Sequence, residues 1–164
     1  MRRLIPVVAA LVLAGCGSGS IADDAPLSEL RVAEPRAEIQ LLSGFHQVEQ
    51  NAWRWTKGKF AVILEAPADA AKKGARLELR FTLPDAVISR RSPVTLSATV
   101  EEQPLMPATY ANSGPQTYAR VVPASAFSGS AVKIDFALDK FLAAGEIEAR
   151  ELGVIVNSIG LRRN

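Results

Sequence analysis

The residues best suited to chemistry lie in the stretch GFHQVEQNAWRWTKGKFAVIL, residues 44–64, which contains His46, Trp53 and Trp55. Residues two apart on a strand share a face, so the two indoles would lie side by side with Arg54 on the opposite face. Adjacent indoles can stack on a sugar ring, which makes Trp53, Trp55 and His46 candidate ligand-binding residues. The alternative is that the indoles fill the core, since each can bury on the order of 200 Å². Because the next run, FAVIL, supplies apolar partners, we expect at least one tryptophan to be buried.

Patterns that would support catalysis or metal binding are weak in this sequence. His46 is the only histidine and the chain has one cysteine, so a zinc ion has no set of ligands. Glu146 and Glu148 could face one substrate as a carboxylate pair, but the stretch AAGEIEARELG is charged throughout and indicates a solvated turn. The adjacent Glu101 and Glu102 would face opposite sides of a strand. We therefore expect no metal, no cofactor and no enzymatic activity, and a small hydrolase with an unrecognised site remains the last alternative.

Apolar and polar residues alternate along most of the chain after residue 39, which is typical of strands with one buried face. The alternating apolar positions are, run by run, Phe60, Val62 and Leu64; Leu77, Leu79 and Phe81; Val94, Leu96, Ala98 and Val100; Val132, Ile134, Phe136 and Leu138; and Leu152, Val154 and Val156. Weaker strands are expected over residues 39–45, 52–56 and 117–122. One short helix is expected over residues 139–144, capped by Asp139 and ended by Gly145.

This series of about eight short strands, separated by Pro, Gly, Asn and Asp, predicts an all-β fold. We expect an antiparallel β-sandwich of jelly-roll or Greek-key type with at most one short helix. The single cysteine excludes a disulfide within the chain, so the domain depends on its hydrophobic core.

The start of the chain has the layout of a secretory signal. Arg2 and Arg3 precede the apolar run LIPVVAALVLA, whose helical length of roughly 16 Å is short of the roughly 30 Å of a bilayer core. The run ends in Leu-Ala-Gly-Cys at residues 13–16, which resembles the lipobox of bacterial lipoproteins. The resemblance implies cleavage after Gly15 and acylation of Cys16, which would give the protein membrane lipid as a partner.

Residues 16–38 are small, polar and interrupted by proline, which indicates a lipidated cysteine followed by a flexible tether. Residues 1–15 would then be the signal peptide and residues 39–164 the sandwich domain. The whole chain has 19 Lys and Arg against 17 Asp and Glu. Removal of Arg2 and Arg3 would leave 17 of each, so no basic field indicates a nucleic-acid partner.

Three short segments, GFHQVEQNAWRWT, LELRFTLP and ARELGVIVNSIGL, are similar to a jelly-roll-like β-sandwich of bacterial cell-envelope proteins. That domain occurs in lipoproteins and attached to glycosyltransferases, and it is loosely called carbohydrate-binding-like. The resemblance places its conserved pattern on Gly44-Phe45, Glu49, Arg54-Trp55 and Arg150-Glu151-Leu152-Gly153. It implies that Glu49, Arg54, Arg150 and Glu151 form structural ion pairs between an early and a late strand.

These observations favour a membrane-anchored lipoprotein whose non-catalytic sandwich binds a ligand in the cell envelope, with glycan as the best candidate. The alternative is a structural or assembly subunit that contacts an envelope protein. The expected location is the bacterial cell envelope. In a Gram-negative host, Gly17 rather than aspartate after Cys16 favours the outer membrane, at its periplasmic face or the cell surface.

Overall fold

The computed structural model of the protein describes residues 26–164. The expected signal peptide, the Leu13–Cys16 motif and acylation of Cys16 therefore lie outside the described residues. Among the described residues, no helix is long and apolar enough to cross a bilayer.

The described chain is dominated by ten antiparallel strands joined in one hydrogen-bonded sheet. The order along the sheet is β6-β5-β9-β3-β10-β4-β8, with β1 beside β10, β2 beside β3, and β7 beside β5. The strands are β1 (Glu29–Arg31), β2 (Leu41–Glu49), β3 (Trp53–Glu65), β4 (Ala75–Leu83), β5 (Val94–Val100), β6 (Gln103–Pro104), β7 (Ala108–Tyr110), β8 (Gly114–Val122), β9 (Ala131–Leu138) and β10 (Ile155–Arg163).

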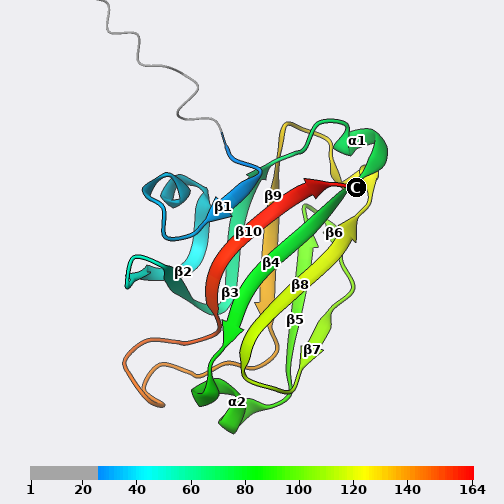
Figure 1. Ribbon diagram of the computed structural model, residues 1–164. Coiled ribbons are helices and arrows are strands. Elements are labelled where there is room, and N and C mark those ends of the chain that lie inside the picture. The colour runs from blue at the N-terminus through cyan, green and yellow to red at the C-terminus, as the bar shows by residue number, and fades with distance from the viewer. Residues whose placement is uncertain (1–25) are drawn as a thin grey trace, which may run out of the picture.

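The sheet folds over on itself at β3, which gives a sandwich of two layers (Figure 1). The start of β3 pairs with β10, through Arg54 opposite Val156. The rest of β3 pairs with β9, from Lys59 opposite Ala137 to Glu65 opposite Ala131. One layer therefore contains β1, β10, β4 and β8, the other contains β2, β9 and β5, and β3 belongs to both.

The core lies between the layers and consists of the apolar positions that alternate in the sequence. Phe60, Leu79, Leu96, Ile134 and Val156 are each at most 1% exposed. The prediction of an antiparallel all-β sandwich is confirmed. The weaker strand expected at 52–56 and the alternating run from Phe60 to Leu64 are one continuous strand, β3, rather than two.

The short helices differ from the expected one. They are η2 (Pro35–Gln40), α1 (Ala70–Lys73), α2 (Asp85–Arg91) and η3 (Ala124–Ala126). No helix forms over residues 139–144. Asp139 accepts a hydrogen bond from the backbone N–H of Thr95 at 2.6 Å instead of capping a helix. Leu142 forms a backbone bridge with Leu152, which keeps this segment extended.

The segment expected to be a tether packs into the sandwich from about residue 27. Leu30 pairs with Ile159 in the sheet, and Leu30 and Val32 are fully buried. Gln40 is 1% exposed, and its side-chain amide exchanges two hydrogen bonds with the backbone of Leu27, at 2.8 and 3.1 Å. The folded unit therefore includes β1 and most of η2, which the sequence predicts as part of the tether. The polar composition of residues 16–38 leads to that prediction, although the segment contains two buried apolar residues.

Candidate functional site

Both tryptophans lie on the outer side of the sandwich, against the expectation that at least one is buried. Arg54 lies opposite Val156, which lies opposite Phe81, and both apolar partners are in the core. Trp55 belongs to the other face, in a row with Ile155, Thr82 and Pro115. Partners directly across an antiparallel pair share a face, so this row points outward. Trp53 and Trp55 are half-buried, and Trp55 packs against the edge of the core.

A polar row follows this apolar row on the same face. Ser158 lies opposite Arg80, which lies opposite Thr117. Two hollows, of about 540 and 260 Å³, share Arg80 and Asn157 in their lining. We call the outer surface of β3, β10, β4 and β8 that carries Trp53, Trp55, Arg80, Asn157 and Thr117 the tryptophan face.

The Arg80 guanidinium is held in place on this face. Its Nε donates to Glu78 at 2.7 Å, and this hydrogen bond lowers the pKa of the Glu78 carboxyl. The Glu78 carboxyl therefore stays ionised over the neutral range. The indole Nε1 of Trp53, by contrast, is shielded from solvent and has no hydrogen-bond partner among the described residues.

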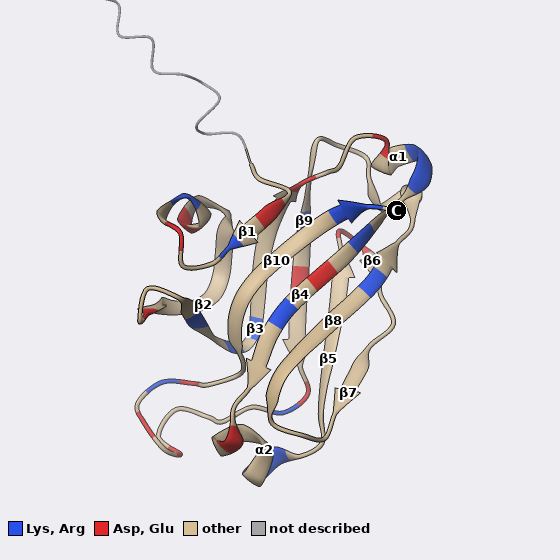
Figure 2. Ribbon diagram, viewed as in Figure 1, with Lys and Arg blue, Asp and Glu red and all other residues tan. Residues whose placement is uncertain are grey.

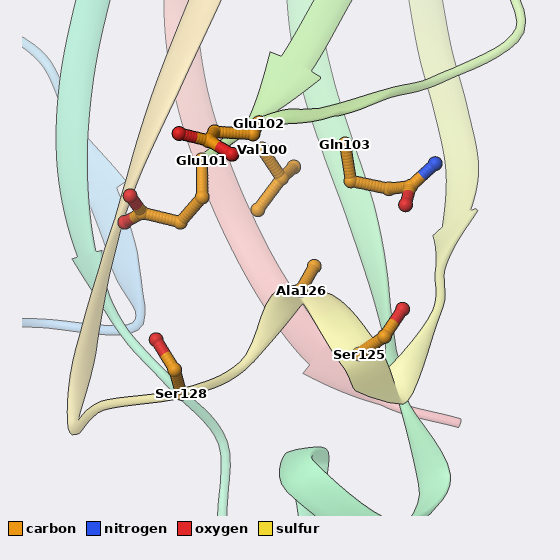
Figure 3. A pocket seen from close by; sticks show the side chains of 7 residues that line it. All are labelled: Val100, Glu101, Glu102, Gln103, Ser125, Ala126 and Ser128. Atoms are coloured by element: carbon orange, nitrogen blue, oxygen red, sulfur yellow. The ribbon is translucent and has the colours of Figure 1, made fainter.

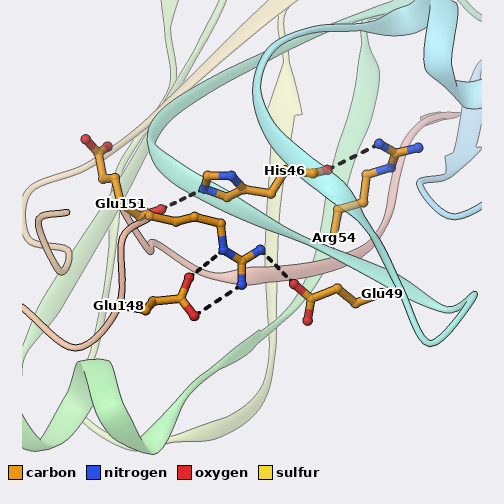
Figure 4. Close-up of polar contacts among 6 residues, drawn as sticks. His46, Glu49, Arg54, Glu148 and Glu151 are labelled. Atoms are coloured by element: carbon orange, nitrogen blue, oxygen red, sulfur yellow. Dashed lines mark hydrogen bonds and ion pairs between the residues drawn. The ribbon is translucent and has the colours of Figure 1, made fainter. Parts of the chain in front are cut away.

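His46 belongs to a network that holds the loop between β9 and β10 against β2 (Figure 4). The His46 Nε2 lies 2.7 Å from the Glu151 carbonyl oxygen. Arg150 donates to Glu49 at 2.8 Å and also pairs with Glu148. Each of these hydrogen bonds joins groups of the protein itself, so His46 is engaged in holding the loop.

Arg54 and Glu151 do not take part in the expected crossed ion pairs. Arg54 is 5% exposed and points to the core side, where it donates to the carbonyls of Val32 at 2.7 Å and His46 at 3.2 Å and pairs with Glu38. Glu151 instead accepts a hydrogen bond from the backbone N–H of Gly58 at 2.7 Å. Of the expected ion pairs, only Glu49 with Arg150 forms. Arg54 is directed under η2, away from the loop that carries Arg150 and Glu151.

Glu146 and Glu148, considered as a carboxylate pair for catalysis, are each paired with a different arginine. Glu146 pairs with Arg91, and Glu148 pairs with Arg150. The hydrogen bond from Arg150 lowers the pKa of Glu148, which is opposite to what a general acid requires. Within residues 26–164, no group of three or more His, Cys, Asp or Glu side chains is placed to hold a metal ion.

A further open hollow, of about 540 Å³, lies between the β5–β6 turn and η3 (Figure 3). It is lined by Glu101, Glu102, Gln103, Ser125 and Ser128, together with Val100 and Ala126. The Glu101 carboxylate accepts a hydrogen bond from the backbone N–H of Lys133 at 2.7 Å, so part of its function is to hold β9. The hollow has no aromatic side chain in its lining.

Comparison with known proteins gives similarity of structure alone. No model of a known protein family matches the chain, and no curated protein matches it. Several solved carbohydrate-binding modules are similar in structure.

The CBM36-1 domain of a multidomain xylanase from the hindgut metagenome of Trinervitermes trinervoides is 13% identical, with a TM-score of 0.40 over 76% of this chain and 92% of that one. A carbohydrate-binding module studied for specific mannan recognition, TmCBM27, is 9% identical, with a TM-score of 0.48 over 85% of this chain and 98% of that one. The CBM51-2 and INT domains of Clostridium perfringens ZmpB, in complex with GlcNAc, are 9% identical, with a TM-score of 0.40 over 85% of this chain and 28% of that one. At these values the similarities do not assign a ligand to this chain.

Arg80, Asn157 and Thr117 belong to the tryptophan face, and the sequence patterns do not identify them as candidates. The alternation of Leu77, Leu79 and Phe81 does place Arg80 on the solvent side of its strand. The missing information is that β10 lies between β3 and β4, since only this order brings Asn157 and Arg80 beside the tryptophans.

Gly153, in the segment that resembles envelope sandwiches, is required by close backbone contact. A Cβ at this position would lie 2.6 Å from the Lys57 carbonyl oxygen and 2.8 Å from both the Leu138 side chain and the Thr56 hydroxyl. We expect Gly153→Ala to lower the free energy of unfolding by about 1–3 kcal/mol, because the backbone has to shift. Chemical denaturation measures this loss. Gly129→Ala is the matched control, since its nearest contact would be 3.6 Å, and equal stabilities of the two variants would contradict the prediction.

Proposed function

We propose that the chain is a lipid-anchored, non-catalytic protein of the bacterial cell envelope whose sandwich domain binds a glycan on the tryptophan face. The observation that carries this proposal is the outward placement of Trp53 and Trp55 on the same face as the two hollows that Arg80 and Asn157 line, with neither indole in the lining itself. The anchor is proposed from the Leu13–Cys16 sequence, which resembles a lipobox.

The chemistry of this face suits a sugar. An indole can pack against the apolar C–H face of a pyranose ring, while guanidinium and amide groups bond its hydroxyls. Arg80 supplies donors only, whereas Asn157 supplies both donors and an acceptor. The shallow, open form of the two hollows favours an extended chain of sugars over a small enclosed molecule.

The double variant Arg80→Ala/Asn157→Ala tests the site. We expect it to bind glycan about tenfold more weakly, because it removes two hydrogen-bonding side chains that contribute about 0.5–1.5 kcal/mol each. Isothermal titration calorimetry with soluble peptidoglycan fragments, and pull-down with lipopolysaccharide and insoluble peptidoglycan, measure the binding. Gln103→Ala/Ser125→Ala, in the hollow of Figure 3, is the matched control and should bind as the unaltered protein does. Absence of binding to all three glycans, or equal loss in both variants, would exclude this site.

A second candidate function is the assembly subunit, and one observation favours it. Strand β2 pairs with β3 on one side alone among the described strands, so its other edge is open. Ile39 and Leu42, beside this edge, are 61% and 47% exposed. An open edge with exposed apolar side chains can accept a strand of a partner protein.

A further inference from the structure

Basic residues gather at the end of the sandwich where the described chain begins (Figure 2). Lys72 and Lys73 end α1, Arg76 is the second residue of β4, and Arg162 and Arg163 end β10. All five side chains are exposed. We call this group the basic end.

The cations come from separate elements that the fold holds together. Arg162 lies opposite Arg76 in the sheet. The Asn164 side chain donates to the Lys73 carbonyl oxygen at 3.1 Å, which ties the end of β10 to α1. Val121 lies opposite Arg76 and is 61% exposed, so an apolar side chain adjoins the cations.

The chain enters the folded domain at the same end. The Leu161 N–H donates to the Ser28 carbonyl oxygen at 2.7 Å, next to Arg162. The Glu65 N–H, at the end of β3, donates to the Leu27 carbonyl oxygen at 3.1 Å. Nine residues lie between Cys16 and Pro26, so the two are ten residue steps apart, a span of at most about 36 Å when extended. A lipid on Cys16 would therefore keep this end within reach of the bilayer.

We propose that the basic end docks on the phosphate headgroups of the membrane that holds the acyl chains of Cys16. This inference rests on the lipid anchor of the proposed function. Acidic side chains also lie at this end, on Glu29, Glu65, Asp69 and Glu78, and Arg162 pairs with Glu29 at 3.1 Å and with Glu78 at 4.0 Å. The five cations still outnumber the four carboxylates. A cation near an anionic bilayer strengthens binding about fivefold. Docking would orient the sandwich with α2, at the far end of β4, directed away from the membrane (Figure 1).

The experiment uses the full lipidated chain reconstituted in vesicles of phosphatidylglycerol and phosphatidylcholine, or of phosphatidylcholine alone. Acylation uses the thiol of Cys16, the only cysteine, so an introduced cysteine can be labelled selectively. A dye is attached at Ala71→Cys in α1 or at Ser89→Cys in α2, two exposed positions at opposite ends. Energy transfer to a headgroup-attached acceptor reports which end lies near the bilayer.

We expect transfer from position 71 to exceed transfer from position 89 at least twofold in anionic vesicles. This ratio should fall by at least half in high salt or in phosphatidylcholine, where the tether alone keeps this end near the bilayer. Lys72→Glu/Lys73→Glu/Arg163→Glu should not show the high ratio in anionic vesicles. Lys57→Glu/Lys59→Glu/Arg90→Glu, with the same change of charge at exposed positions elsewhere, should retain it. Equal transfer from both ends, or equal effects of the two triple variants, would overturn the docking. Flotation with the vesicles is measured in parallel, with Cys16→Ala as the unlipidated control. Failure of the unaltered chain to float overturns the anchor and the docking, whereas flotation without orientation overturns the docking alone.

Discussion

Replacing Phe136 with alanine is expected to lower the free energy of unfolding by about 3–5 kcal/mol. The Phe136 ring is 2% exposed and stacks on Phe60 across the β3–β9 pair, with ring centroids 4.9 Å apart and an interplanar angle of 13°. Phe60 in turn meets the edge of Phe45 at 5.4 Å. The alanine would therefore leave a cavity beside two other rings that cannot close it without moving β2 and β3.

Urea denaturation followed by circular dichroism measures this loss. Asp135→Ala is the matched control, since Asp135 is the neighbouring residue on the outer face of β9 and pairs with Lys133 at 2.9 Å. Removal of such a surface pair costs under about 1 kcal/mol. A loss under about 1 kcal/mol for Phe136→Ala would mean that the two faces of β9 are reversed.

Arg54→Ala is expected to lower the free energy of unfolding by a similar amount, about 3 kcal/mol. The substitution leaves the carbonyl oxygens of Val32 and His46 without their donor, and each buried unsatisfied group costs about 1–3 kcal/mol. The ion pair with Glu38 adds little, because the Glu38 side chain is 61% exposed. Arg54→Lys should recover only part of the loss, since an ammonium cannot reproduce the fork that reaches three acceptors.

Thermal melts of Arg54→Ala and Arg150→Ala distinguish the two arginines. The Arg150 side chain is 37% exposed, as are its partners Glu49 and Glu148 to a similar degree, so its removal should cost under about 1 kcal/mol. Equal melting temperatures for the two variants would contradict the role assigned to Arg54. If Arg54→Ala melts as the unaltered protein does but loses glycan binding, the arginine belongs to the ligand site.

The sequence predicts the core best where the strands alternate regularly. In β4, β5 and β9, the apolar positions of the pattern are the buried ones, including Leu77, Val94 and Ile134. The start of β3 is the exception. Alternation places Arg54 and the tryptophans on opposite faces, but hydrophobicity assigns the wrong face to the core, since Arg54 and Thr56 point inward. The inner side of this end contains backbone groups that take side-chain partners: the Val32 carbonyl oxygen accepts from Arg54, and the Val154 N–H donates to the Thr56 hydroxyl.

The candidate site is less predictable than the core because it depends on pairing between distant strands. Trp53, Trp55 and His46 lie within ten residues of one another in the sequence, yet they do not form one site. His46, on β2, contacts the loop before β10, whereas the tryptophans, on β3, belong to the outer face of the sheet. The contact between Glu49 and Arg150 requires the loop before β10 to return to β2. Local patterns do not contain this information, and the register of the strands decides it.

The central place of β10 has a consequence for the order in which the chain folds during synthesis. This last strand lies between β4 on one side and β3 and β1 on the other, and Arg162 contacts Glu29, 133 residues earlier. Until residues 155–163 have left the ribosome, the β4–β8 pair has no connection to β3, and the first layer cannot form. Contacts of such long sequence separation slow folding, so nascent chains should remain unfolded until β10 has left the ribosome. In the proposed exported protein, the same delay would keep the chain in the extended form needed to cross a membrane.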